Sequence, residues 1–158
     1  MRLKALQPQQ ALVCMPPGAS RDRLVFESTI ESAVANADFV QENVPERVTL
    51  KTDVHAEISR HTRPGVVIAS SSSGLLPSEI QSQSIRPESH LIGHPFAPVY
   101  LLPLVEVVGG KDTSEQAVNA AGAFYTSIGM RPLRVRKEVD AYIGDRLQEA
   151  IWREALHL

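Results

Sequence analysis

The sequence is poor in the features that mark several classes of protein. Its single cysteine, Cys14, cannot form a disulfide within the chain, which favours a reducing compartment. No apolar run approaches the ~20 residues that a membrane-spanning helix needs, and the first residues lack the apolar segment of a secretion signal. The formal net charge is -2, which argues against nucleic acid or an anionic membrane as a partner. We therefore expect a cytoplasmic protein.

A further absence concerns glycine. No Gly-x-Gly-x-x-Gly occurs anywhere in the 158 residues, so the usual backbone cradle for the pyrophosphate of a dinucleotide is missing. There are no internal repeats, and the four serines from Ser70 to Ser73 are the only low-complexity stretch. Hydrophobic residues make up 43% of the chain, an ordinary value for a globular protein of a length that can enclose one core.

Short apolar segments alternate with amphipathic ones, which predicts an α/β fold with a parallel sheet. Strands are expected at 24–26, 38–42, 65–69, 90–92, 104–108 and 132–135. Helices are expected at 30–34, 45–61, from 77 onward, 113–128 and 140–158, and residues 1–20 resemble the tail of a helix followed by a loop. Ser28, with Glu31 three residues later, and Thr113 are the expected N-caps, and Gly129 should end its helix.

Three polar side chains stand beside or inside predicted strands. Ser73 follows the strand at 65–69, His94 comes 21 residues later, and Glu106 follows His94 by 12 residues. A histidine, whose unperturbed pKa is about 6.5, suits the removal of a hydroxyl proton near neutral pH. A carboxylate can orient the imidazole and stabilise the imidazolium, and a serine can hydrogen-bond the reacting oxygen. Together they indicate a site that oxidises an alcohol.

Each of these residues also has a structural explanation when it is considered alone. His94 could be a hydrogen-bonded core histidine, and Ser73 could simply form a strand-to-helix turn. Glu106 is flanked by Val105 and Val107, so burial of its carboxylate would be costly unless it is paired. Only the joint spacing favours a catalytic site over these explanations.

The sequence resembles the 3-hydroxyacyl-CoA dehydrogenase superfamily, most closely its L-carnitine dehydrogenase branch. The family pattern is a strand ending in a serine-rich turn, then His-x-Phe-x-Pro, then Leu-Val-Glu-Val. Here these are Ser70–Ser73, His94–Pro98 and Leu104–Val107. The runs Tyr100–Glu106 and Trp152–Leu158 point to the carnitine branch. The resemblance covers nearly the whole chain.

The resemblance implies a partial Rossmann-like NAD-binding domain with a mostly parallel sheet over residues 1–138. Residues 139–158 would be the first helix of an all-α C-terminal domain. The family's opening strand, Gly-rich turn, helix and second strand have no counterpart here, so we expect the chain to be truncated. Residues 24–26 should then lack a neighbouring strand and the strand at 38–42 should have an open edge, which predicts marginal stability.

The resemblance also implies roles for individual residues in the NAD-dependent oxidation of the 3-hydroxyl of L-carnitine to 3-dehydrocarnitine. His94 would be the general base, Glu106 its orienting carboxylate, and Ser73 would contact both the reacting oxygen and the cofactor. Glu46 and Lys51 fall at family positions that contact the nicotinamide side of NAD; an exposed helix face is the alternative for both. No residue is assigned to a metal ion, and full-length members are expected to be homodimers.

Substrate preference depends on positions where the chain departs from the common family pattern. Asp145 replaces an asparagine that helps to position the substrate, and an ionised aspartate suits a cationic substrate better than an acyl-CoA thioester. Its alternative is a solvated helix carboxylate. Ala97 replaces the asparagine of His-Pro-Phe-Asn-Pro, and an aromatic wall for a trimethylammonium group could come from Phe96, Tyr100 or Trp152.

Three further possibilities remain open from the sequence. The basic residues Arg131, Arg134, Arg136 and Lys137 could attract a substrate carboxylate, although a solvated edge is more usual for such a run. The protein could be a short-chain 3-hydroxyacyl-CoA dehydrogenase. It could also be a non-catalytic remnant or a partner-binding fragment, which the missing Gly-rich turn favours.

Overall fold

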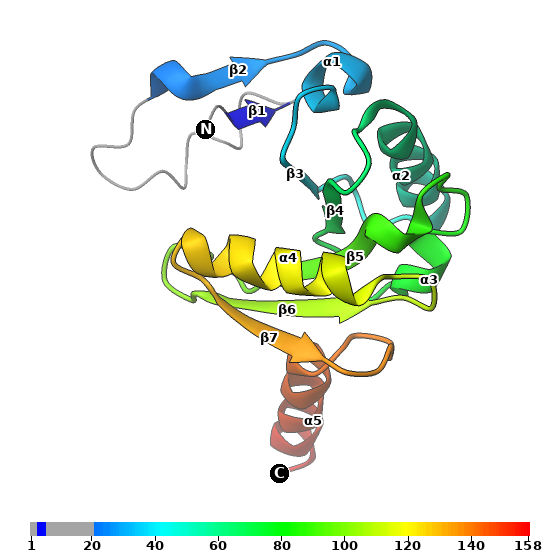
Figure 1. Ribbon diagram of the computed structural model, residues 1–158. Coiled ribbons are helices and arrows are strands. Elements are labelled where there is room, and N and C mark those ends of the chain that lie inside the picture. Colours follow the sequence, from blue (N-terminus) through cyan, green and yellow to red (C-terminus); the bar gives the residue numbers. More distant parts are fainter. Residues whose placement is uncertain (1–2, 6–20) are drawn as a thin grey trace.

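The computed structural model describes residues 3–5 and 21–158 (Figure 1). Its strands are β1 (Leu3–Ala5), β2 (Leu24–Phe26), β3 (Phe39–Glu42), β4 (Val67–Ser70), β5 (His90–Pro95), β6 (Leu104–Gly109) and β7 (Arg131–Val135). Its helices are α1 (Ile30–Val34), α2 (Val48–His61), α3 (Pro77–Ile80), α4 (Glu115–Ser127) and α5 (Gly144–His157). None of these helices has the length and apolar character needed to span a bilayer.

The main sheet has five strands in the order β3-β4-β5-β6-β7. All neighbouring pairs are parallel except β5 and β6, which run antiparallel. The expected α/β architecture with a mostly parallel sheet is therefore confirmed. The antiparallel pair matters for His94 and Glu106, because the loop between the two strands brings the end of β5 next to the start of β6.

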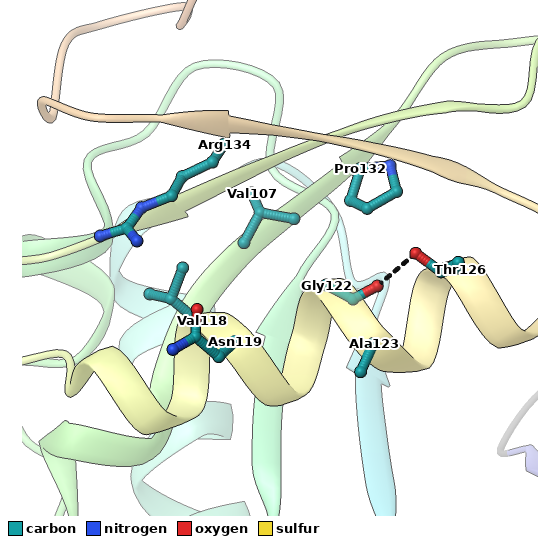
Figure 2. A pocket seen from close by; sticks show the side chains of 8 residues that line it. All are labelled: Val107, Val118, Asn119, Gly122, Ala123, Thr126, Pro132 and Arg134. Carbon is teal, nitrogen blue, oxygen red and sulfur yellow. Dashed lines mark hydrogen bonds between the residues drawn. The ribbon is translucent and has the colours of Figure 1, made fainter.

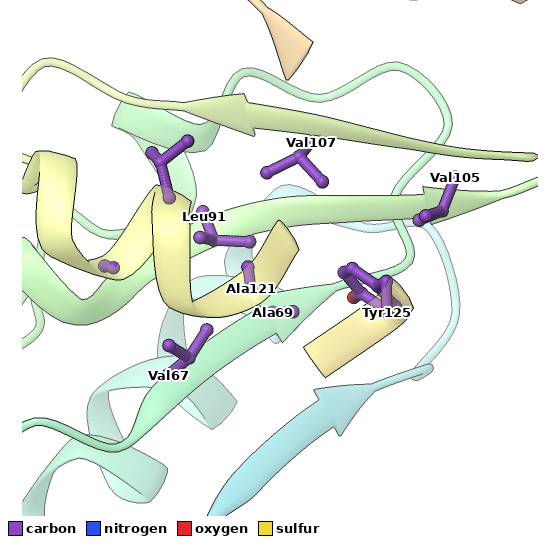
Figure 3. Close-up of a cluster of buried hydrophobic side chains, with 9 residues drawn as sticks. Val67, Ala69, Leu91, Val105, Val107, Ala121 and Tyr125 are labelled. Carbon is purple, nitrogen blue, oxygen red and sulfur yellow. The ribbon is translucent and has the colours of Figure 1, made fainter. Parts of the chain in front are cut away.

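Both faces of the sheet are buried, which explains the near-continuous apolar runs of its central strands. Helix α4 covers one face, called here the α4 face, where Ala121 and Tyr125 pack on Val67, Leu91 and Val107 (Figure 3). On the opposite face, α1 and α2 pack on β4, and α3 packs on β5 and β6. Because strand residues alternate between faces, the polar residues at Glu42, Ser70, His94 and Glu106 fall on this second face.

The N-terminal part of the described chain differs from expectation. Leu24–Phe26 does have a neighbour, because β2 pairs in parallel with β1. The helix tail expected within 1–20 is wrong at 3–5, which form β1; the remainder of that segment lies outside the described residues. As expected, β3 stands at the end of the main sheet. A strand partner close to the N-terminus was missed because three residues are too few to show a period.

Two helix caps also differ from the sequence-based assignment. Thr29, not Ser28, caps α1, and its Oγ1 accepts a hydrogen bond from the Ser32 amide at 3.2 Å. Ser114, not Thr113, caps α4. The Thr113 hydroxyl instead donates to the His90 carbonyl at 2.6 Å, a tertiary contact that outweighs its local capping preference. Helix α2 starts at Val48 rather than at residue 45.

The last helix, α5, begins at Gly144 rather than at residue 140, and none of its residues is buried. Leu147, Ile151 and Leu156 recur at helical spacing and are 61%, 68% and 88% exposed. The apolar stripe expected from the sequence therefore exists but has no covering element among the described residues. In contrast, Gly129 ends α4 as expected, with a positive φ of 87° that suits glycine.

Gly93, on the α4 face of β5, allows a close contact between the sheet and α4. A methyl group at this position would lie 1.8 Å from the Tyr125 hydroxyl, which donates to the Gln41 side chain at 2.5 Å. We expect Gly93→Ala to lower the free energy of unfolding by about 1–3 kcal/mol, because the packed tyrosine must move. Urea unfolding measures this change.

The matched control is Gly122→Ala in α4, where a methyl group meets nothing within 4 Å. This variant should raise the free energy of unfolding by about 0.5–1 kcal/mol, because alanine loses less backbone entropy than glycine in a helix. Equal effects of the two substitutions would show that the contact between Gly93 and Tyr125 is unimportant.

Candidate active site

His94 and Glu106 are cross-strand partners in the β5–β6 pair and contact each other directly. The His94 Nδ1 lies 3.0 Å from Glu106 Oε2. Glu106 is fully buried and His94 is 6% exposed. When neutral His94 carries its proton on Nδ1, this contact is a hydrogen bond and Nε2 is left with a free lone pair. The pairing expected from the spacing is therefore present in the structure.

The second oxygen of Glu106 binds the start of α5. Oε1 accepts hydrogen bonds from the backbone amides of Ile143 and Gly144, at 2.9 Å and 3.0 Å. The carboxylate thus has three donors, which compensates the loss of water on burial. Sequence reasoning anticipated that Glu106 needs a partner but missed these two amides, because backbone donors leave no residue-type signal.

Two aromatic rings flank the His94 imidazole. The Phe96 and Tyr142 ring centroids lie 5.0 Å and 5.7 Å from it, both at tilted angles. Tyr142 is fully buried and its hydroxyl donates to the Leu75 carbonyl at 2.6 Å. Burial raises the pKa of Tyr142, so the hydroxyl stays a donor. Phe96, considered as a wall for a substrate cation, therefore packs against the histidine itself.

The serine-rich turn after β4 is held by the Glu46 carboxylate. Glu46 Oε1 accepts from the backbone amides of Ser73 and Gly74, at 3.1 Å and 3.4 Å, and from the Ser72 hydroxyl. Ser73 is exposed, whereas Ser72 is buried. The structure therefore brings together Glu46 and Ser73, which the sequence assigned to the cofactor, and adds Ser72, which it missed.

Lys51 is fully buried, so the alternative of an exposed helix face is wrong for this residue. Its ammonium lies 3.0 Å and 3.1 Å from the two oxygens of Glu42, 3.0 Å from the Val44 carbonyl and 3.5 Å from Glu46 Oε2. In this structure Lys51 supports Glu46 from the interior. The Glu46 side chain itself is 45% exposed and reachable.

Glu42 joins Lys51 to a pair of buried histidines. Glu42 Oε2 lies 3.2 Å from His55 Nε2, and the Nδ1 atoms of His55 and His90 are 2.8 Å apart. Although burial opposes ionisation, hydrogen bonds from His55, Ser70 and Lys51 lower the pKa of Glu42 to about 2. Burial lowers the pKa of His55 and lowers that of His90 to about 3. This cluster escaped sequence reasoning because its members are scattered and form no motif.

The remaining sequence candidates lie on exposed parts of the molecule. Asp145 is partly exposed in the first turn of α5, next to the amides that bind Glu106. Tyr100 is 67% exposed in the loop between β5 and β6. The basic residues at 131–137 are exposed on and just beyond the edge strand β7, where Arg134 pairs with Glu115, so the solvated edge is the reading that the structure supports.

A small pocket of about 190 Å³ lies between α4 and β7 (Figure 2). Val107, Val118, Gly122 and Pro132 line it, with Arg134 at its rim. Val107 and Val118 belong to the cluster on the α4 face, and none of the lining residues belongs to the His94–Glu106 pair. Within residues 3–5 and 21–158, no group of three or more His, Cys, Asp or Glu side chains is arranged to hold a metal ion.

The fold and its site define a Rossmann-like NAD-binding domain, and comparisons with known proteins narrow the class. Residues 4–139 match the NAD binding domain of 3-hydroxyacyl-CoA dehydrogenase. L-carnitine dehydrogenase of Pseudomonas putida is 61% identical over 144 residues, which are 91% of this chain and 45% of that protein. The chain therefore belongs to the 3-hydroxyacyl-CoA dehydrogenase family. It spans about half the length of the curated relatives that it matches.

Solved structures support the same assignment. The crystal structure of 5-formyl-3-hydroxy-2-methylpyridine 4-carboxylic acid 5-dehydrogenase, an NAD+-dependent dismutase, gives a TM-score of 0.82 at 33% identity. The match covers 94% of this chain and 48% of that one. (S)-3-hydroxybutyryl-CoA dehydrogenase from Ralstonia eutropha gives 0.79 at 25% identity, over 85% of this chain and 47% of that one.

The buried histidines predict how stability depends on pH. An unfolded histidine has a pKa of about 6.5, above the folded values for His55 and His90, so the unfolded chain binds protons first on acidification. The free energy of unfolding should be highest above pH 6.5 and fall toward pH 3, by up to about 1.4 kcal/mol per pH unit for each histidine. Urea unfolding at a series of pH values measures this slope.

His90→Asn tests the origin of that slope. The asparagine amide can still donate to His55 Nδ1, but it does not titrate, so the decline between pH 6.5 and 5 should become shallower. A slope equal to that of the unmodified chain would contradict the assignment of the effect to His90. The slopes are compared between pH 6.5 and 5, because the Glu42 carboxyl contributes most of its pH dependence below its ordinary pKa of 4.5.

Proposed function

We propose that this chain carries the alcohol-oxidising site of an NAD-dependent dehydrogenase that converts L-carnitine to 3-dehydrocarnitine. The observation that supports the proposal most directly is the buried contact between His94 Nδ1 and Glu106 Oε2. Because this contact occupies Nδ1, Nε2 of His94 is left to accept a proton from the substrate. The identity to L-carnitine dehydrogenases supports the same chemistry.

In the proposed reaction, His94 Nε2 accepts the proton of the substrate 3-hydroxyl as the C3–H bond breaks. The imidazolium that results is stabilised by the Glu106 carboxylate, which faces Nδ1–H. Bound NAD+ would accept the hydride from C3, so the alcohol gives up one hydride to the cofactor and one proton to His94 and becomes a ketone. Ser73 would hydrogen-bond the reacting oxygen and help to place it over His94.

The residues present fit the nicotinamide end of the cofactor. Glu46 and the serine-rich turn lie at the carboxyl ends of β3 and β4, where parallel α/β sheets bind nucleotides. The fixed Glu46 carboxylate and the exposed Ser73 are the groups that would meet the nicotinamide, while Lys51 would hold Glu46 in place. No Gly-x-Gly-x-x-Gly for the pyrophosphate is present in the 158 residues.

Asp145 supports a cationic substrate over a thioester. Asp145 is partly exposed and directly follows Ile143 and Gly144, whose amides bind Glu106, so chain connectivity holds it close to the site. A carboxylate would attract the trimethylammonium group of L-carnitine and offers no N–H to an acyl thioester. Oxidation of a short-chain 3-hydroxyacyl-CoA is the second candidate, favoured by the structural similarity to 3-hydroxybutyryl-CoA dehydrogenase.

The first test is a titration of the purified chain with NADH, followed by cofactor fluorescence. We expect saturable binding, because contacts within the protein hold Glu46 and the serine-rich turn in place. NAD+ with L-carnitine should then yield NADH, and His94→Ala should lower turnover by roughly 10²–10⁴-fold, the usual contribution of a general base.

Turnover that is unchanged in His94→Ala would remove His94 from the chemistry. Val99→Ala is the matched control, because this exposed residue lies in the same β5–β6 loop and has no assigned role in the site. A folded chain that binds no NADH would instead favour the non-catalytic alternative. Higher turnover with 3-hydroxybutyryl-CoA than with L-carnitine would favour the second substrate.

A further inference from the structure

Residues 141–144, called here the strap, lie directly across the His94–Glu106 pair. The Ile143 and Gly144 amides bind Glu106, and the Tyr142 ring packs beside His94. The Ala141 amide approaches the Gly74 carbonyl at 3.4 Å, which ties the same segment to the serine-rich turn. One four-residue segment therefore contacts Glu106, His94 and the serine-rich turn.

The strap has an unfavourable backbone conformation. Ala141 and Tyr142 have φ angles of 56° and 47°, in the left-handed region that side chains with a Cβ seldom adopt. Two such residues in succession persist only when other contacts compensate for them. The compensating contacts here are the buried Tyr142 ring, its bond to the Leu75 carbonyl and the two amides on Glu106.

The approach of the strap to the site also requires glycine at position 144. A methyl group there would lie 2.1 Å from Cζ of Phe96. The Phe96 ring in turn packs against the His94 imidazole. There is no space to relieve this contact without moving either Phe96 or the start of α5. A side chain at residue 144 therefore forces either the strap or the Phe96 ring beside His94 to shift.

We propose that the strap is a positioning element for His94, with Tyr142 as its positioning residue, and that it couples the site to α5. Two amides occupy Glu106 Oε1, so the carboxylate cannot rotate and Oε2 stays directed at Nδ1 of His94. With the strap displaced, the carboxylate and the imidazole are free to turn, and the tautomer with its lone pair on Nε2 is no longer enforced. This inference rests on the proposed role of His94 as the base.

In this coupling, movement of α5 acts on the site, because α5 has no buried residue of its own. Any displacement of α5, or of chain packed against its apolar stripe, reaches the sheet through the strap. The position of the helix would then decide whether His94 presents Nε2 as an acceptor. The strap would thus link the position of α5 to the protonation of His94.

The experiment compares two substitutions in the strap, one of which adds a methyl group while the other removes one. Gly144→Ala should displace the strap, whereas Ala141→Gly should leave it in place, because glycine adopts a positive φ without cost. Nitrogen-15 NMR of the histidine rings, in mildly alkaline buffer, identifies which ring nitrogen of His94 carries the proton. Amide hydrogen exchange at residues 143 and 144 measures the two bonds to Glu106.

We expect the unmodified chain and Ala141→Gly to show His94 with its proton on Nδ1. Gly144→Ala should show a mixture of tautomers and at least about tenfold faster exchange at 143 and 144, with the distant His55 signals unchanged. If Gly144→Ala does not fold, Tyr142→Phe serves instead, because it keeps the ring and removes only the hydroxyl, which bonds to the Leu75 carbonyl and to Ser72. It should accelerate the same exchange and partly release the tautomer.

Two negative results can be told apart. Faster amide exchange without any change in the His94 tautomer would overturn the strap proposal and leave the His94–Glu106 pair intact. If His94 of the unmodified chain carries its proton on Nε2, or if Glu106→Gln has no effect on the His94 ring signals, the pair itself fails. The proposed function would then fail with it.

Discussion

A carboxylate in the interior must be given hydrogen-bond donors, and this requirement organises the face of the sheet that carries the site. Glu106 obtains its donors from two separate segments, the neighbouring strand and the start of α5. Without them, burial of a charge would cost several kcal/mol. The hairpin, the strap and the last helix are therefore positioned by one side chain.

Glu42 applies the same solution at the other end of the sheet. Its donors come from Lys51, His55, Ser70 and the Val44 amide, and Lys51 in turn faces Glu46 at the serine-rich turn. The serine-rich turn is thus supported by ion pairs in the interior, while the His94–Glu106 pair is supported by backbone amides. Both arrangements fix a carboxylate through contacts within the protein.

The sequence was sufficient for the fold class, most element positions and the pairing of His94 with Glu106, because strand alternation and motif spacing are local signals. It was insufficient for contacts made by backbone groups or by residues far apart in the chain. The amides of Ile143 and Gly144 belong to the first kind, and the His55–His90 contact to the second. Thr113 shows a third limit, since a good local cap was taken by a tertiary bond instead.

The antiparallel register of β5 and β6 has a consequence for how this protein can vary. His94 and Glu106 face each other because the register of the β5–β6 pair places them opposite each other. Residues can therefore be added or lost in the loop at 97–103 without separating them. A shift of one residue within either strand is different, because it would turn one member of the pair toward α4. Length variation among homologues should therefore concentrate in that loop and be absent from the two strands, which leaves the loop free to diversify while the chemistry stays in register.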